Sequence, residues 1–157
     1  MGFRPGDVFS HRNIANIINP TDISLLSVVE YAVAQLTVTH IVVCGHTSCG
    51  GVAATLGNGK LGVIDVWLQP MRILREQHAE ELKNLEGAEK TNLLCKLNVQ
   101  AGLGVLRRIP TVLDAIRDRG LKVHGLLYDL GTGLLEQVDT EEPIDLGAAR
   151  EAAFERM

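Results

Sequence analysis

An apolar, β-branched run leads directly into a glycine-rich turn in the first third of this chain. The run is Ile41-Val42-Val43, and the turn reads Cys44-Gly45-His46-Thr47-Ser48-Cys49-Gly50-Gly51. The run predicts a buried strand. The two glycines after Cys49 allow the backbone to pass close to its neighbours and allow a helix to begin without crowding by Cβ atoms. A strand, a tight turn and a helix in this order constrain the local fold strongly.

The same turn sets an imidazole and a thiol three residues apart, at His46 and Cys49. Both groups are ligands that zinc uses in proteins. The alternative interpretation is a glycine-rich connection that holds a buried thiol and a chance histidine, since free cysteine often behaves as a small core residue. The spacing by itself leaves both interpretations open.

Strand and helix patterns alternate along the chain, which predicts an α/β fold with a mainly parallel sheet flanked by helices. We expect strands at 7–11 and 39–44, and a C-terminal β-hairpin formed by 123–129 and 134–138. We expect helices at 22–35, 51–56, 64–85, 88–108 and 110–120, and a last one at 146–157. No linker or repeat divides the chain, so residues 1–157 are expected to form a single domain.

Composition limits the classes of partner. The chain has 157 residues, a formal net charge of −4 and scattered Lys and Arg, which excludes a typical nucleic-acid binder. No apolar run approaches about 18 residues, so no membrane span is expected. Three cysteines are an odd number and favour a reducing compartment. We expect a cytoplasmic protein, or an organellar one if an N-terminal segment has been removed.

Several further motifs accompany the turn. They are Pro5-Gly6-Asp7-Val8-Phe9, His11-Arg12-Asn13-Ile14-Ala15-Asn16, Trp67-Leu68-Gln69-Pro70, Asn98-Val99-Gln100, and Tyr128-Asp129 with Gly131-Thr132-Gly133. In this combination, over nearly the whole length, the chain resembles the β-class carbonic anhydrases. The resemblance implies a β-carbonic-anhydrase-like fold, a Zn²⁺ cofactor and the reversible hydration of carbon dioxide to bicarbonate.

The resemblance also assigns roles to individual residues. His46 and Cys49 match zinc ligands of the family. Phe9, Ile14 and Tyr31 match residues that line the carbon dioxide pocket, and Gly50 matches a position that offers a backbone N–H beside the substrate. Because the family shares this pocket between subunits, the resemblance implies a homodimer or a homotetramer.

One family motif is absent from the sequence. The family carries a zinc-binding Cys-x-Asp-x-Arg on a central strand upstream of the segment that matches Pro5-Gly6-Asp7, and no such motif occurs in the 157 residues. Loss of that strand would leave two strand edges unpaired, so the sheet must close up, borrow a strand or belong to a trimmed chain. We also expect slow or absent hydration. Cys44 is a candidate substitute ligand, because a strand that continues through Gly45 places Cys44 and His46 on one side.

Rival functions remain open. Gly45-x-x-x-x-Gly50 has the glycine spacing of a phosphate-binding loop, but Gly51-Val52 stands where such a loop has Lys and Ser or Thr. The chain could also be an inactive family member that acts as a binding or scaffolding subunit, or a zinc hydrolase of a carbon dioxide analogue such as carbon disulfide. The remaining polar candidates are interpreted as surface or satisfied structural histidines, and Cys95 as a core residue. These histidines are His11, His40, His78 and His124.

Overall fold

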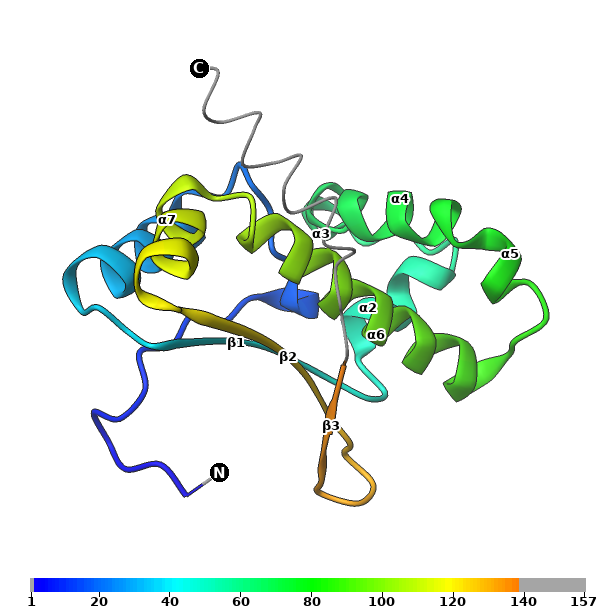
Figure 1. Ribbon diagram of the computed structural model, residues 1–157. Helices are drawn as coiled ribbons and strands as arrows, with labels where there is room; N and C mark the ends of the chain where they lie inside the picture. The colour runs from blue at the N-terminus through cyan, green and yellow to red at the C-terminus, as the bar shows by residue number, and fades with distance from the viewer. Residues whose placement is uncertain (1, 139–157) are drawn as a thin grey trace.

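A three-stranded mixed sheet supports the candidate site, in a computed structural model that describes residues 2–138 (Figure 1). Strand β1 (His40–His46) pairs in parallel with β2 (Lys122–Tyr128), and β2 pairs antiparallel with β3 (Leu135–Gln137). The register places Val43 opposite Gly125. The parallel pair and the C-terminal hairpin confirm the expected α/β class.

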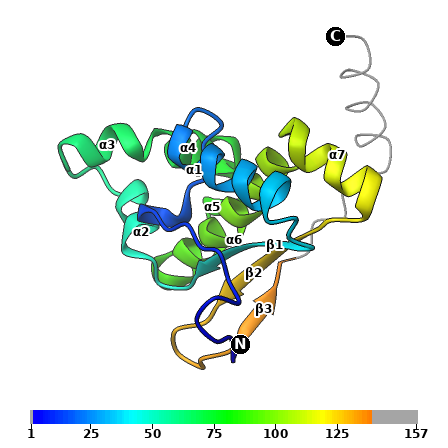
Figure 2. The same ribbon diagram turned by 90° about the vertical axis from the view of Figure 1, so that its left-hand side faces the viewer.

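The described helices gather on one face of this sheet (Figures 1 and 2). The long helix α6 (Gly87–Leu106) packs directly against both β1 and β2. Its Val99 and Leu103 are fully buried against the strands. A Cβ atom at Gly125 would lie 2.8 Å from Leu103 Cδ1 and 3.0 Å from Val99 Cγ1, so only glycine permits this close approach.

Local sequence signals set the ends of the helices around β1. Helix α1 (Ile23–Glu30) begins at Asp22, whose carboxylate accepts hydrogen bonds from the N–H groups of Ser24 and Leu25, and a π-helical turn, Tyr31–Gln35, continues it. Helix α7 (Pro110–Arg119) starts with Pro110 and ends at Gly120, which is left-handed with φ 69°. These boundaries confirm the predictions for 22–35 and 110–120.

The helix predicted over 64–85 is divided. The structure has α3 (Val63–Trp67), α4 (Gln69–Gln77) and α5 (Ala79–Leu82) in its place. Pro70 has no N–H to donate and favours the first turn of a helix, so the chain leaves the helical path at Leu68 and begins again. The short helix after the candidate metal turn, α2 (Gly50–Leu56), lies as predicted.

Two other predictions have different outcomes. The strand expected at 7–11 is wrong, since these residues form a bend and irregular backbone and are mostly exposed. Strand conformation depends on pairing, and the described sheet gives this segment no partner. The helix expected at 146–157 lies outside the described residues. Among residues 2–138, no helix combines the length and apolarity needed to span a bilayer.

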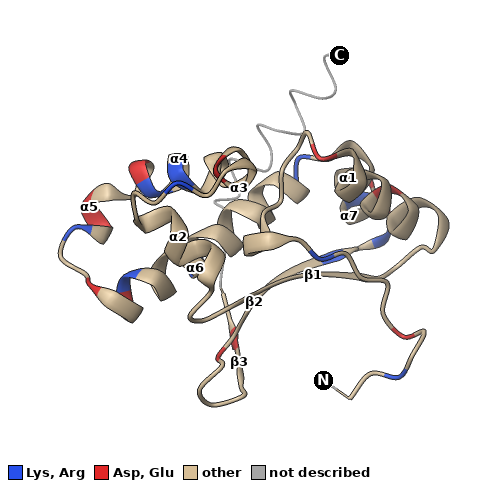
Figure 3. Cartoon of the chain, turned by 180° about the vertical axis from the view of Figure 1, so that it is seen from behind, with Lys and Arg blue, Asp and Glu red and all other residues tan. Residues whose placement is uncertain are grey.

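Acidic and basic residues are interspersed along the outer helices, as the colours in Figure 3 show for α4, α5 and the start of α6. Lys83 pairs with Glu80, and Arg75 lies 3.7 Å from Glu76. Exposed pairs of this kind contribute little to stability, about 0–1 kcal/mol each. The mixed signs agree with the scattered charge in the sequence.

Candidate metal centre

His46 and Cys49 lie at the junction of β1 and α2. His46 is the last residue of β1, and Cys49 is the residue before the first turn of α2, where Ala53 N–H donates to its carbonyl at 2.9 Å. Both side chains line one small cavity of about 10 Å³. The other lining residues are Ala15, Asn16, Gly45, Val52, Cys95 and Asn98. The fold therefore brings the two predicted ligands to one place.

The hydrogen bonding of His46 decides which ring nitrogen is available. Nδ1 lies 2.9 Å from the backbone carbonyl oxygen of Thr47. A carbonyl oxygen only accepts, so Nδ1 carries the proton and donates. Nε2 then keeps its lone pair, which is the form of imidazole that binds a metal.

The donor set fits zinc in chemistry but not in number. An imidazole nitrogen and a thiol sulfur are both zinc ligands, and catalytic zinc usually has three protein ligands. The buried Oδ1 of Asn16 has no hydrogen-bond partner, and Asn16 lines the same cavity. Within residues 2–138, however, no three or more His, Cys, Asp or Glu side chains converge on a common point. His46 and Cys49 thus remain a pair of candidate ligands, one fewer than a catalytic zinc site usually has.

Cys95 is a core residue, as the sequence predicts, and it also lines this cavity. Burial raises the pKa of its thiol to about 11, and a hydrogen bond from the backbone N–H of Cys49 opposes this shift in part. Cys95 therefore stays protonated near neutral pH and touches the loop as a neutral group. Its place beside Cys49 could not be inferred from the spacing of the cysteines.

Cys44, the proposed substitute ligand, lies elsewhere. It is exposed, its Sγ atom is 3.6 Å from the carbonyl oxygen of Gly45, and it is not among the residues that line the cavity. Desolvation raises the pKa of its thiol, which disfavours the thiolate that a metal needs.

The residues matched to a carbon dioxide pocket are partly exposed in the single chain. The rings of Phe9 and Tyr31 contact each other with centroids 5.8 Å apart. The carbonyl of Ile14 accepts a hydrogen bond from Trp67 Nε1 at 2.8 Å, and its Cγ2 atom lies close to Gly51. Gly50 faces open space. Gly50 is thus the first residue of α2, and Ile14 lies beside the first turn of this helix.

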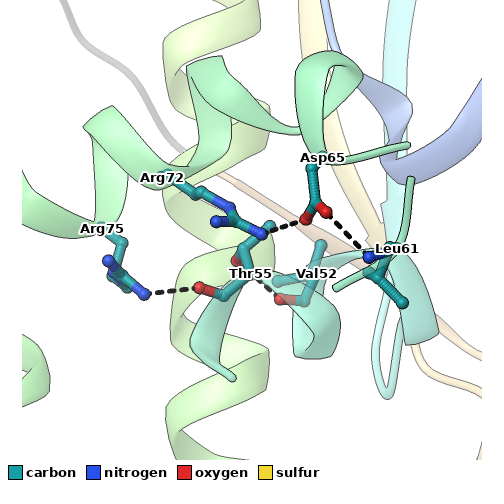
Figure 4. A network of polar contacts seen from close by, with 6 residues as sticks. All are labelled: Val52, Thr55, Leu61, Asp65, Arg72 and Arg75. Atoms are coloured by element: carbon teal, nitrogen blue, oxygen red, sulfur yellow. Dashed lines mark hydrogen bonds and ion pairs between the residues drawn. The ribbon is translucent and has the colours of Figure 1, made fainter. Parts of the chain in front are cut away.

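A polar network holds α2 in position (Figure 4). Arg75 on α4 donates to the carbonyl oxygen of Thr55 at 2.7 Å, near the end of α2. Arg72, one turn earlier, pairs with Asp65 of α3, whose other oxygen accepts from the N–H of Leu61 at 2.7 Å. Arg75 thus ties the end of the helix that follows Cys49 to α4, and Arg72 ties α4 to α3.

Two histidines without an obvious partner in the sequence prove to be partners of each other. His40 Nδ1 and His124 Nε2 lie 2.9 Å apart on neighbouring strands. His78 pairs with Glu81, three residues away, at 2.6 Å. These three residues are therefore satisfied structural histidines, as expected.

Comparison with known sequences assigns the chain to a family. The profile described as carbonic anhydrase matches residues 1–135. The chain belongs to this family. It is 43% identical over 138 residues to a carbonic anhydrase of Candida albicans, an alignment that covers 86% of this chain and 49% of that protein. It is 40% identical over 145 residues to a carbonic anhydrase of Emericella nidulans, with coverage of 91% and 64%.

Solved structures support the β-carbonic anhydrase fold. The β-carbonic anhydrase CafA of Aspergillus fumigatus matches with a TM-score of 0.95 and 54% identity, over 98% of this chain and 74% of that one. One of two tetrameric β-carbonic anhydrases from Sordaria macrospora matches with a TM-score of 0.87 and 50% identity, over 88% and 72%. The chain thus spans between 49% and 64% of the two fungal sequence relatives.

Proposed function

We propose that this chain carries a zinc-dependent carbonic anhydrase site, which interconverts carbon dioxide and bicarbonate. The observation that supports this proposal most is that His46 and Cys49 line the same cavity. In addition, His46 Nδ1 donates to the carbonyl oxygen of Thr47, which leaves Nε2 free to bind a metal. His46 Nε2 and Cys49 Sγ would hold the zinc ion. Further donors would have to come from outside the described cluster, because zinc takes four ligands.

Bound zinc would supply a hydroxide nucleophile near neutral pH. Apolar side chains would suit carbon dioxide because the molecule has no net charge. Ile14, beside Gly51, and the Phe9–Tyr31 pair are the residues that would supply them, although none of the three lines the cavity of His46 and Cys49 within one chain. The backbone N–H of Gly50 would donate to an oxygen of the product bicarbonate, and a Cβ atom at Gly50 would meet nothing within 4 Å, so the backbone there is open to approach.

We expect hydration by the 157-residue chain to be slow. The sequence contains no Cys-x-Asp-x-Arg, so a thiolate ligand and the accompanying Asp-Arg pair of the family pattern are missing from it. The loss of one member of a cooperating catalytic set commonly lowers the rate by about 100-fold or more.

We also propose that the protein assembles as a homodimer or homotetramer in a reducing, cytoplasmic setting. The exposed fractions of Phe9, Ile14 and Tyr31 are 50%, 51% and 51%, so a second subunit would bury them. The tetrameric relatives from Sordaria macrospora support an oligomer. All three cysteines are free, which supports a reducing compartment.

Zinc analysis and kinetics test the proposal together. Purified wild type is expected to retain zinc after dialysis, and Cys49→Ser and His46→Ala are expected to lose most of it. Stopped-flow hydration with a pH indicator should give a rate that is measurable but well below that of a full-length relative assayed in parallel. Equal zinc in wild type and both variants would refute the assigned ligands.

An inactive binding or scaffolding subunit is the second candidate. It is favoured by one observation, that no group of three metal-ligating side chains converges in residues 2–138. In that case zinc-saturated wild type and Cys49→Ser would give the same background rate. A rate that depends on Cys49 would exclude this alternative.

A further inference from the structure

A second and larger cavity lies beside the segment that precedes α1. It has a volume of about 180 Å³ and is bounded by residues 17–20, by α4 and by α6 (Figure 2). Of the residues that line it, only Asn98 also lines the small cavity of His46 and Cys49. Protein interiors contain few voids larger than a water molecule, so a space of this size is unusual.

The cavity has a buried end and an exposed mouth. Ile17 and Leu74, which line the buried end, are only 2% and 9% exposed. Pro20, Gln77 and Ala101 also line the cavity, and these three residues are exposed. The cavity is therefore a pocket that a small molecule can enter from solvent.

The walls of this pocket are held by contacts within the chain. A Cβ atom at Gly102 would lie 2.8 Å from Ile18 Cγ1, so Ile18 packs directly on the backbone of α6. Asn19 Oδ1 accepts from the N–H of Thr21 at 3.0 Å and from the Thr21 hydroxyl at 2.8 Å. A pocket that is already formed spends little binding free energy on ordering its walls.

The lining favours a neutral ligand. Among the described residues that border the pocket, none carries a charge, and the polar side chains are the amides of Asn19, Gln77 and Asn98. An ion would lose hydration there without gaining a counter-charge. Asn98 already donates to the carbonyl of Ala15. The Gln77 side chain makes no hydrogen bond to the part of the chain that the structure describes, so its amide is available to a ligand.

We propose that this pocket binds a small, neutral, apolar ring that carries one hydroxyl group, such as a phenol. The ring occupies the buried end beside Ile17 and Leu74, and the hydroxyl group forms a hydrogen bond with Gln77 at the mouth. The size agrees, since an engineered apolar cavity of about 150 Å³ in another protein binds benzene. This binding site goes beyond the proposed function, because it requires neither a metal nor the β1–α2 turn.

Titration of the full chain with phenol, followed by backbone amide NMR shifts, tests the proposal. We expect the largest shifts in residues 17–20 and 101–105. Ala101→Leu places a larger apolar side chain at the border of the pocket and should weaken phenol binding by about 10-fold or more. Ala88→Leu is the matched control, because it makes the same change at an exposed position of α6 that does not line the pocket. It should bind phenol like wild type.

Two further comparisons test the chemistry of the ligand. Benzoate keeps the ring but carries a negative charge, so it should bind about 10-fold more weakly than phenol, or less. Gln77→Met removes the amide at the mouth and keeps the length of the side chain. It should lower the affinity for phenol by about 2-fold to 10-fold and leave the affinity for benzene unchanged.

Several outcomes would overturn the proposal. Equal phenol affinity in wild type and Ala101→Leu would place the binding elsewhere, and equal affinity for phenol and benzoate would refute a neutral site. No shifts with phenol near its solubility limit would also refute it. If Ala101→Leu then converts an oligomer to a monomer in light scattering, a second copy of the chain occupies the pocket instead.

Circular dichroism verifies folding of each variant. Should Ala101→Leu not fold, the unbranched Ala101→Met makes the same comparison. Because the phenol titration needs no metal, its failure would leave the proposed zinc site untouched, and the failure of zinc binding would leave the pocket untouched.

Discussion

The side-chain amide of Asn98 donates a hydrogen bond to the backbone carbonyl of Ala15 at 2.8 Å, across 83 residues of sequence. It reaches the carbonyl of Asn16 as well, at 3.2 Å. Ala15 and Asn16 are both left-handed, with φ 60° and 52°. One buried amide thus holds a strained turn that forms a wall of the candidate metal cavity.

Asn98→Ala is expected to lower the free energy of unfolding by about 1–3 kcal/mol, because two carbonyl groups lose a buried donor. Urea denaturation followed by circular dichroism measures the change. Asn84→Ala, in an exposed turn, should change stability by less than about 0.5 kcal/mol. Equal effects of the two substitutions would contradict the structural role of Asn98.

Two glycines near the centre of the fold should respond to alanine with opposite signs. A Cβ at Gly125 would lie 3.0 Å from the carbonyl oxygen of Val138 and 2.8 Å from Leu103 Cδ1, whereas one at Gly104 meets nothing within 4 Å. We expect Gly125→Ala to destabilise the protein by about 1–3 kcal/mol through overpacking. Gly104→Ala, inside α6, should stabilise it by about 0.5–1 kcal/mol. Thermal unfolding of both variants distinguishes these signs, and a shared sign would be inconsistent with the packing described.

Replacement of Cys44 should leave the metal centre intact. Cys44 is exposed and lies outside the cavity, while Cys49 lines it. Cys44→Ser is therefore expected to retain the zinc content of wild type under conditions in which Cys49→Ser loses it. Elemental analysis after gel filtration gives the comparison. Loss of zinc from Cys44→Ser would instead support its role as a substitute ligand.

Asp129, in the turn after β2, should make the free energy of unfolding depend on pH in the acidic range. Asp129 Oδ1 accepts from the N–H groups of Thr132 at 2.9 Å and Gly131 at 2.7 Å. These hydrogen bonds lower the pKa of Asp129 below its usual 3.8, and the bond from Thr132 has the largest effect. A lowered pKa in the folded state stabilises the protein above the unfolded value, and this contribution disappears as pH falls through the folded value.

Asp129→Asn keeps the oxygen but loses the charge. Its deficit in unfolding free energy relative to wild type should be largest near neutral pH and should shrink in acid. Urea midpoints measured across this range provide the test, and a deficit independent of pH would contradict it.

Assembly can be measured directly by light scattering at micromolar concentration. We expect a mass at least twice the 17.0 kDa of one chain. Phe9→Ser combined with Tyr31→Ser should shift the mass toward the monomer, because it removes two exposed rings that contact each other. A wild-type monomer would argue against a pocket shared between subunits.

Elements whose signals lie within a few neighbouring residues were predictable. The run before Cys44 and the glycines after Cys49 predict β1, the turn and α2, and Pro110 with Gly120 predicts α7. That His46 and Cys49 lie together was predictable, because both come from one short turn, whereas their spacing alone left their role as zinc ligands open. The family resemblance is confirmed by the match of residues 1–135.

The sequence by itself determined the local elements and the pair of donors, since strand, turn and helix preferences depend on adjacent residues. Only the tertiary structure decided which distant groups support that pair. The contact of Ser48 with Asn92 and that of Ala15 with Asn98 span 44 and 83 residues. They arise because glycines at 45 and 125 let α6 pack closely on β1 and β2. Pairing also left 7–11 without strand structure, because a strand exists only beside a partner.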